Sequence, residues 1–338
     1  MTSTIPETGT ATRDSAGTAT VAPAAGTDFG ALTVVHTRHY LRWIFAAVIV
    51  FVVLQLLWSL VTNDKFGWSV FSDYFFAPAV LTGLGMTLTL TAVAGSLGFI
   101  LGTVLALARL SKSPILNSVS WSFIWFFRSV PLLVQLLVWY NLGYLYPRLG
   151  LGVPFTDNYF WSFDTVTVVS QFAAAVLGLS LHQAAYSAEI IRGGILSVDQ
   201  GQLEAAAALG LPRRVRVLRI IMPQAARSIL PNAFNEIIGL LKGTSIVSVI
   251  ALGELFYVVQ VVYNRNQQVI PLLLVAVVWY ILITTVLSIA QYYVERHFAR
   301  GSVRVLPPTP LQRARIWVST QWARLDDDAV PPTSGAAS

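Results

Sequence analysis

Few side chains in this sequence could carry chemistry, and the most conspicuous is a lysine inside an apolar stretch. The segment Lys242-Gly243-Thr244-Ser245 lies between runs of Leu, Ile and Val. A lysine at an apolar helix centre costs about 2.5–3.5 kcal/mol, so we expect its amine to face a cavity, backbone carbonyls, or a carboxylate such as Glu236 or Glu254. Two interpretations stay open. Lys242, Thr244 and Ser245 line or gate a polar route, or Lys242 forms a structural ion pair or extends to a membrane surface.

Other polar residues in apolar surroundings are weaker candidates for such a route, because polar side chains also pack between helices. They are Gln135, Asn141, Asn232 and Asn235. Catalysis finds little support: there is no cysteine for thiolate chemistry, His182 has no second histidine nearby, and there is no phosphate-binding glycine-rich loop with a lysine. We therefore predict neither an enzyme nor a metal or cofactor site in this chain.

A second stretch is polar and rich in alanine, although it lies between two long apolar runs. It begins Glu204-Ala205-Ala206-Ala207-Ala208-Leu209-Gly210 and is followed by four arginines. Asp199 and Gln202 are spaced as a helix N-cap and its reciprocal partner, and Gly210 is typical of a helix end, so we predict a helix of about ten residues. It is too short to cross a bilayer. One interpretation is a helix that docks into a partner through its small-residue face; the other is an ordinary capped surface helix.

The composition defines the class of protein in which these residues lie. The chain is 55% hydrophobic and 11% charged, and its apolar residues form several runs of membrane-spanning length. Of its 22 Lys and Arg residues, seventeen fall at one set of loops and termini, three at the opposite set, and two within or beside apolar segments. This asymmetry is the positive-inside pattern of a membrane protein, so the net charge of +6 does not indicate nucleic-acid binding.

The apolar runs predict an all-α polytopic protein with six spans and both termini on the inside. Five of these spans are about Trp43–Val61, Leu81–Ala108, Leu132–Tyr146, Val166–Ile191 and Ile270–Tyr292. The remaining run, about Ser228–Val262, would measure about 50 Å as one straight helix against an apolar thickness of about 30 Å. We predict that it breaks near Lys242–Ser245, where backbone could unwind around a polar cavity.

The segments between and around the spans also have predicted roles. Residues 1–40 and 300–338 read as cytoplasmic tails, the first of them disordered, and residues 63–78 and 147–164 as outer loops. Pro114–Phe127 resembles a helix at the membrane interface, and a second short helix is predicted from Pro212. Within the second span, small residues recur every four positions and predict close helix packing: Ala94, Gly98, Gly102 and Ala106.

Several motifs identify a family. Glu-Ala-Ala, three residues, Gly, nine residues and then Ile-x-Leu-Pro is the hallmark of permease subunits of ABC importers, and residues 204–223 match it with Met222 in place of Leu. Over residues 81–293 the chain resembles the polar amino acid permeases of histidine, glutamine, glutamate, arginine or opine type. The further motifs are Gly85-Met86-Thr87-Leu88-Thr89-Leu90-Thr91, Arg128-Ser129-Val130-Pro131-Leu132-Leu133, Ala185-Tyr186-Ser187-Ala188-Glu189-Ile190-Ile191-Arg192-Gly193, Gly201-Gln202 and Lys242-Gly243-Thr244-Ser245.

This resemblance implies a type I ABC importer transmembrane domain of five core helices, here preceded by an extra transmembrane helix at residues 41–62. The loop 197–223 would carry a coupling helix that docks into a separate ATPase, with Glu204, Ala205, Ala206, Gly210, Ile220, Met222 and Pro223 as coupling residues. The pathway or gate would include Lys242, Thr244, Ser245, Glu236, Gln135 and Asn141. ATP and magnesium would bind the ATPase and not this chain.

The same resemblance implies further partners and a location. They are an extracytoplasmic amino acid-binding protein, a second permease copy that is identical or a sister chain, and the lipid of a bacterial inner membrane. The family usually has Asp where this chain has Gly243, so Lys242 lacks that local acidic partner. The main alternative is an ion-coupled secondary amino acid transporter, with Glu189, Glu236 and Glu254 as a proton relay. Such transporters typically show internal repeats, and none is visible here.

Overall fold

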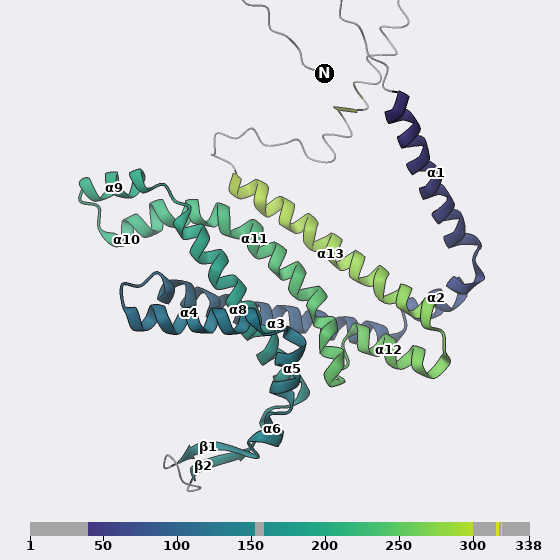
Figure 1. The fold of residues 1–338 in the computed structure, drawn as a ribbon, viewed down its shortest axis with the longest axis horizontal. Helices are drawn as coiled ribbons and strands as arrows, with labels where there is room; N and C mark the ends of the chain where they lie inside the picture. Colours follow the sequence, from purple (N-terminus) through teal and green to yellow (C-terminus); the bar gives the residue numbers. More distant parts are fainter. Residues whose placement is uncertain (1–39, 153–158, 300–315, 318, 320–338) are drawn as a thin grey trace, which may run out of the picture. The chain divides into compact units, whose positions relative to one another are not determined.

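The computed structural model describes residues 40–152, 159–299, 316, 317 and 319, and these residues are almost entirely helical (Figure 1). Most of both predicted tails, residues 1–40 and 300–338, lies outside that range, so their predictions stay predictions. The chain divides into two compact units, Met1–Asn63 and Asp64–Ser338. The first contains α1, Tyr40–Thr62, which is apolar on every face and coincides with the predicted span at 41–62.

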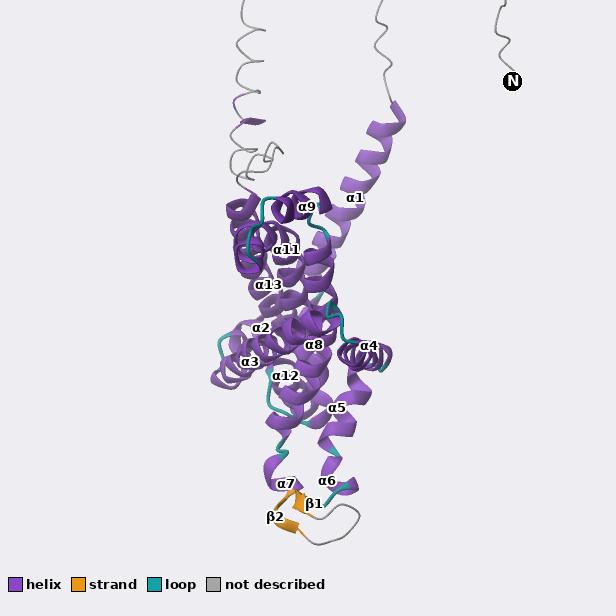
Figure 2. Ribbon diagram, turned by 90° about the vertical axis from the view of Figure 1, so that its left-hand side faces the viewer, coloured by secondary structure: helices purple, strands orange, loops and turns teal. Residues whose placement is uncertain are grey.

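The second unit holds the remaining elements, and most of them are helices. The bounds are η2 Asp64–Phe66, α2 Trp68–Phe75, α3 Pro78–Arg109, α4 Pro114–Ser129, α5 Leu132–Tyr140, α6 Leu142–Leu145, β1 Arg148–Gly152, β2 Tyr159–Asp164, α7 Thr165–Val168, α8 Gln171–Leu196, α9 Gln200–Ala208, α10 Arg213–Val215, η3 Arg216–Ile221, α11 Met222–Gly243, η4 Thr244–Ile250, α12 Leu255–Asn266 and α13 Val269–Ala299. The strand pair and α9 lie at opposite ends of this unit (Figure 2).

The centre of the second unit is the contact between α3 and α8, which we call the α3–α8 seam. Its α3 side is Ala94, Gly98, Gly102 and Ala106, and its α8 side is Ser180, Gln183, Ala184, Ser187 and Ala188. A Cβ atom at Gly98 would lie 2.6 Å from Gln183 Cβ, and one at Gly102 would lie 2.7 Å from Ser187 Cβ. The small-residue stripe predicted on the second span therefore lets two backbones approach closely.

Helix α8 is long enough to span a membrane but less apolar than the other long helices. By length and composition four helical stretches qualify as spans, and α8, with its 26 residues, is not one of them. Its buried residues are mostly Ala, Gly, Ser and Gln, and α3, α4, α5 and α11 pack around it. Because protein rather than lipid covers this helix, small and weakly polar side chains suit it better than large apolar ones. The predicted span from Val166 begins instead at Gln171, after α7.

Helices cover the predicted third span, Leu132–Tyr146, as α5 and then, after a break at Asn141, α6 up to Leu145. The α5 helix alone has nine residues, about 14 Å at 1.5 Å per residue, which is less than an apolar layer of about 30 Å. It follows α4 after a bend of 101°, and by length and composition the two helices form either one broken span or a re-entrant loop. Pro131 marks this bend because proline disfavours a helical conformation in the residue before it. Pro114–Phe127, predicted as an interface helix, therefore belongs to this bent pair.

Both predicted outer loops contain regular structure. Residues 63–78 include α2, whose Phe75 ring stacks on the Trp279 ring of α13 at 4.9 Å between centroids. The Trp279 indole nitrogen also donates a hydrogen bond to the Phe75 carbonyl at 2.9 Å. In residues 147–164, β1 and β2 form an antiparallel hairpin that pairs Arg148 with Asp164. Tertiary contacts and strand pairing, which local composition does not reveal, organise these segments.

A helix begins at Arg213, directly after Pro212 as predicted, but it continues to Ile250 as one helical stretch and does not end as a separate short helix. Its early part, η3, is a π-helix that directly precedes Pro223. A proline removes a hydrogen bond and crowds the carbonyl four residues before it, and a wider π-turn relieves that crowding. The stretch changes to 3₁₀ geometry at Thr244, close to the predicted break, and ends at Ala251, whose φ is 58°.

Candidate functional site

Helix α9 is closed at both ends by its own residues. At its start, the Asp199 carboxylate accepts a hydrogen bond from the backbone N–H of Gln202 at 3.0 Å. At its end, Gly210 donates to the Ala207 carbonyl at 2.9 Å and Leu211 donates to the Ala206 carbonyl at 3.1 Å. This is the Schellman arrangement, which needs a left-handed residue, and Gly210 has φ of +66°. The predicted capped helix and sharp exit turn are confirmed.

Helix α9 presents most of its surface to the outside of the unit. Ala206 is its one buried residue, while Glu204, Ala205, Ala207 and Ala208 are exposed. Leu209, just beyond the helix, is 77% exposed. Of the other residues predicted for coupling, Ile220 is half-buried, and Met222 and Pro223 are exposed. The structure therefore offers a short helix with an uncovered small-residue face.

A hydrogen bond between two glutamines ties α9 to the start of α11. The Gln224 amide nitrogen donates to the Gln202 side-chain oxygen at 2.6 Å and to the Ile220 carbonyl at 3.0 Å. The Gln202 side chain thus bonds across to α11, whereas the sequence predicted a reciprocal cap on Asp199. This bond bridges α9 and the long helix that begins at Met222. Sequence spacing alone did not reveal this link.

The lysine segment forms the end of α11. The Lys242 side chain is exposed, and neither ion pair among the described residues, Arg148–Asp164 or Arg192–Glu189, includes it. The Thr244 hydroxyl donates to the Leu241 carbonyl and the Ser245 hydroxyl to the Lys242 carbonyl, each at 2.7 Å. These bonds satisfy carbonyls where the α-helix gives way to 3₁₀ geometry. Lys242 therefore does not form the carboxylate pair that the sequence allowed.

Gly243 leaves room for a side chain. Its φ is −64°, an ordinary helical value, and a Cβ atom there would meet only Leu132 Cδ2, at 4.0 Å. Neither the backbone nor the packing requires glycine at this position. This chain thus differs chemically from the family, which usually has aspartate at this position, and the fold does not require that difference.

The other predicted pathway residues lie in different settings. Glu236 is half-buried on α11 and is attracted electrostatically by Arg128 of α4. Gln135 is buried, and its amide nitrogen donates to the carbonyls of Phe127 at 3.0 Å and Val130 at 2.8 Å, which holds the α4–α5 bend. Asn141 is exposed and donates to the Leu137 carbonyl of its own helix at 2.8 Å. The structure thus does not gather these residues into one cluster.

Glu254 is fully buried and joins three helices. Its carboxylate caps α12 by accepting from the backbone N–H groups of Phe256 at 3.0 Å and Tyr257 at 2.6 Å. It also accepts from the hydroxyls of Thr87 on α3 at 3.4 Å and Tyr280 on α13 at 3.3 Å. Four donors leave little capacity for a further partner, so Glu254 holds the helices together. Sequence analysis missed this role, although Thr87 lies in a quoted family motif.

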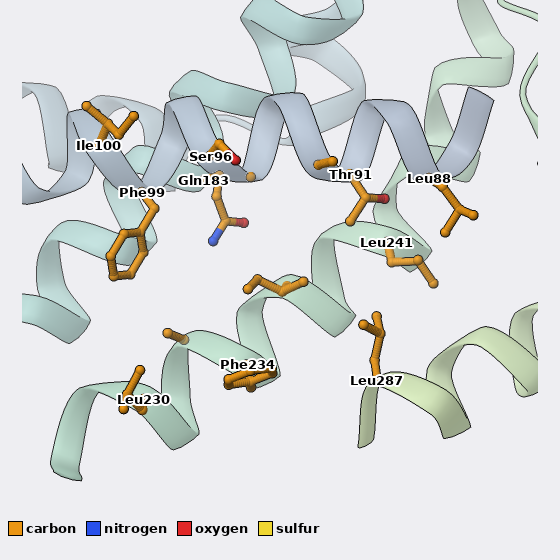
Figure 3. Close-up of a pocket in the computed structure, with 14 residues that line it drawn as sticks. Leu88, Thr91, Ser96, Phe99, Ile100, Gln183, Leu230, Phe234, Leu241 and Leu287 are labelled. Atoms are coloured by element: carbon orange, nitrogen blue, oxygen red, sulfur yellow. The ribbon is translucent and has the colours of Figure 1, made fainter. Parts of the chain in front are cut away.

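A cavity of about 790 Å³ lies between α3 and α11 (Figure 3). Its polar residues are Thr91, Ser96 and Gln183, and the rest of its lining is apolar, including Phe99, Phe234 and Leu287. The Gln183 amide projects into the space from α8. An amino acid needs partners for both its ammonium and its carboxylate, and no charged residue lines this cavity. This cavity therefore offers no charged partner for either group.

No group of three or more His, Asp or Glu residues in the described part of the chain could hold a metal ion. His182 lies 3.5 Å from the Gln135 amide nitrogen and its ring lies beside that of Tyr186. Helices α3, α4, α5 and α11 packed around α8, together with the apolar helices α1 and α13, define a polytopic membrane protein.

Residues 98–300 match the family model described as "Binding-protein-dependent transport system inner membrane component", and the chain belongs to this family. It is 40% identical over 272 residues to ArgU of Corynebacterium glutamicum, an arginine transport system permease protein, covering 80% of this chain and 84% of the relative. It is 33% identical over 228 residues to NocM of Agrobacterium fabrum, a nopaline transport system permease protein, covering 65% and 89%.

Solved structures agree on the fold. The structure described as an amino acid ABC transporter with histidines matches with a TM-score of 0.56 at 34% identity, covering 67% of this chain and 97% of that chain. The MetNI methionine ABC transporter matches with a TM-score of 0.54 at 18% identity, which concerns the fold alone. The chain therefore has a type I ABC importer transmembrane domain and is a transport permease subunit, not an enzyme.

The family assignment leaves the secondary-transporter alternative without support. Two of its three proposed relay carboxylates also have separate partners. Glu189 pairs with Arg192 at 2.7 Å, and Glu254 is held by four donors.

Proposed function

We propose that this chain is the permease subunit of an ABC importer that moves a polar amino acid, or a close derivative, into the cell. The observation that carries the coupling mechanism is the exposed small-residue face of α9, capped at both ends and tied to α11. Relatives named for arginine and nopaline transport support the substrate class. The two termini are cytoplasmic in this proposal, which places α9 on the cytoplasmic side.

Three kinds of partner follow from the proposal. A separate ATPase receives α9 in a cleft and binds ATP and magnesium, an extracytoplasmic binding protein delivers the amino acid, and a second permease copy, identical or sister, completes the pathway. Movement of the ATPase pair displaces α9 as a rigid body. The Gln202–Gln224 hydrogen bond then passes this displacement to α11 and its lysine segment.

The proposed pathway runs beside α11. Its charged residues are exposed Lys242 and half-buried Glu236, whose opposite charges match the carboxylate and the ammonium of a passing amino acid. Its further proposed residues are Thr244, Ser245, Gln135 and Asn141, whose side chains each donate to a backbone carbonyl at or near a helix end. Lys242→Met is expected to reduce both uptake and substrate-stimulated ATP hydrolysis, and unchanged values for both would remove Lys242 from the pathway.

The coupling proposal is tested by reconstituting the chain with its ATPase and binding protein in vesicles. A screen of amino acids should identify a substrate that stimulates ATP hydrolysis and is taken up. Ala205→Trp, on the exposed face of α9, is expected to weaken ATPase binding and uptake together by about tenfold, because overpacking a close contact costs 1–3 kcal/mol. The matched control is Ala79→Trp, an exposed alanine on α3. Normal ATPase binding by the Ala205 variant would contradict the docking role.

A further inference from the structure

A second cavity, of about 460 Å³, lies where α3 and α8 end, beside α4. Three arginines from three different helices line it, namely Arg109, Arg128 and Arg192, and Glu189 supplies its one carboxylate. The lining therefore has an excess of positive charge. Neither the coupling mechanism nor the proposed pathway assigns a role to this cavity as a whole.

The donors of these arginines are only partly used. The Arg192 guanidinium donates twice to Glu189, at 3.1 and 2.7 Å, and an Arg109 terminal nitrogen donates to the Asn117 side-chain oxygen. The Arg109 Nε atom is buried without a partner among the described residues. The Arg128 guanidinium lies over the Tyr186 ring, 5.1 Å from its centroid. A guanidinium has five N–H donors, and among the described residues Arg109 and Arg192 together use three of their ten, while Arg128 is also attracted to Glu236. Unused donors on Arg109 and Arg192 can therefore bind an anion.

The aromatic side of the cavity indicates a membrane surface. Trp121 and Trp125 of α4 stack with their centroids 6.2 Å apart, and both are more than half exposed. Ile124 lies between them in sequence and is buried. Tryptophan collects where an apolar layer meets water, at the level of lipid headgroups. Free guanidinium donors at this level match the phosphate of a lipid headgroup in charge and geometry.

We infer that this cavity binds the phosphate headgroup of an anionic phospholipid, with its acyl chains lying against the exposed Trp121 and Trp125. On the proposed topology the lipid belongs to the cytoplasmic leaflet, the same side as α9. Its headgroup contacts the ends of α3 and α8 as well as α4. The bound lipid therefore holds α4 against the α3–α8 seam. The ligand chemistry is a phosphodiester with a net negative charge.

The test uses the complete complex with its ATPase in nanodiscs of phosphatidylcholine and phosphatidylglycerol, with native mass spectrometry to measure retained lipid. The wild type is expected to retain phosphatidylglycerol over phosphatidylcholine. Arg109→Gln should lower that retention about fivefold, and Arg109→Gln with Arg192→Gln should lower it roughly 25-fold, since each basic residue near the surface contributes about the same attraction. Arg109→Lys should keep most of it. Arg227→Gln, an exposed arginine of α11 outside the cavity, is the matched control.

Three results of the retention measurement would overturn the inference. They are equal retention by wild type and double variant, equal retention of both lipids, and displacement of phosphatidylglycerol by millimolar inorganic phosphate, which would identify a free-phosphate site. A photoactivatable phosphatidylglycerol adds a readout on unmodified protein, because it should label the peptide that carries Trp121 and Trp125, and labelling confined to other helices contradicts the site. Lipid retention is measured without transport, so its loss leaves the proposed import function intact.

Discussion

Two regions of this protein are built from the same small residues and differ in what covers them. In the α3–α8 seam, glycine and alanine of α3 meet α8 so closely that an added Cβ atom at Gly98 or Gly102 would collide with it. In α9, Ala205, Ala207 and Ala208 form an equally smooth face that remains exposed. Both helices carry the feature that permits close approach. Only the small-residue face of α3 is covered by another helix of the same chain.

The difference shows how to interpret small residues in a membrane protein. In the seam they serve stability, because dispersion contacts and backbone proximity hold the helices together where lipid supplies no hydrophobic driving force. In α9 they do little for the fold, since Ala206 is the one residue of that helix that is buried. An alanine-rich face that the fold leaves uncovered is therefore available to another chain.

The largest effect is expected in the seam. Gly102→Ala places a methyl group 2.7 Å from Ser187 Cβ and 2.9 Å from the Ala184 carbonyl, and backbone cannot yield as a flexible side chain can. We expect a loss of about 1–3 kcal/mol in stability, seen as a lower unfolding midpoint in detergent and as less folded protein in the membrane. Gly85→Ala, on the same helix with nothing within 4 Å, is the control and should be neutral or slightly stabilising. Equal unfolding midpoints of the two variants would contradict close packing in the α3–α8 seam.

A smaller effect on stability, with a clear effect on coupling, is expected at Gly210. Its φ of +66° suits glycine, and a β-branched residue there costs roughly 1–2 kcal/mol. Gly210→Val should therefore deform the exit of α9 and lower ATPase binding and uptake together, while the unfolding midpoint changes little. Asn tolerates this conformation best among other residues, so Gly210→Asn should retain most of both activities. Full uptake by the valine variant would mean that the turn is not needed for coupling.

The tie between α9 and α11 is expected to contribute less. Gln202→Ala and Gln224→Ala each remove the 2.6 Å side-chain hydrogen bond, and the net value of such a bond is about 0.5–1.5 kcal/mol. In reconstituted vesicles each variant should hydrolyse ATP while importing less substrate per ATP. The double variant should be no worse than either single one. Additive losses would show that the two glutamines act independently.

The smallest effect is expected at Gly243. Gly243→Asp restores the residue usual in the family at a helical position where a side chain fits, so stability should change by about 0.5 kcal/mol or less. Uptake of the substrate should persist, with any change confined to its concentration dependence. A large loss of folded protein would show that the space around Gly243 is already filled.

Much of the fold follows from the sequence because long apolar runs, charge asymmetry and helix caps are local signals. The α9 helix was predicted from Asp199 and Gly210, and the packing stripe from a four-residue repeat on α3. The predictions failed where distant contacts decide. The nine-residue α5 is bent by 101° from α4, and residues 63–78 contain α2, whose Phe75 stacks on Trp279 more than two hundred positions away.

The features of the candidate site also divide into those that the sequence predicted and those that only the tertiary structure shows. By itself the sequence determined the family, the short capped helix between Asp199 and Gly210 and the change of helix geometry near Thr244, because each depends on residues that are neighbours along the chain. Only the tertiary structure decided that Glu254 is saturated by donors from three helices, that Lys242 has no carboxylate partner among the described residues, and that Arg109, Arg128 and Arg192 share one cavity. Hydrogen bonds and charge pairs act over a few ångströms in space, and spacing along the chain does not specify which distant residues come within that range.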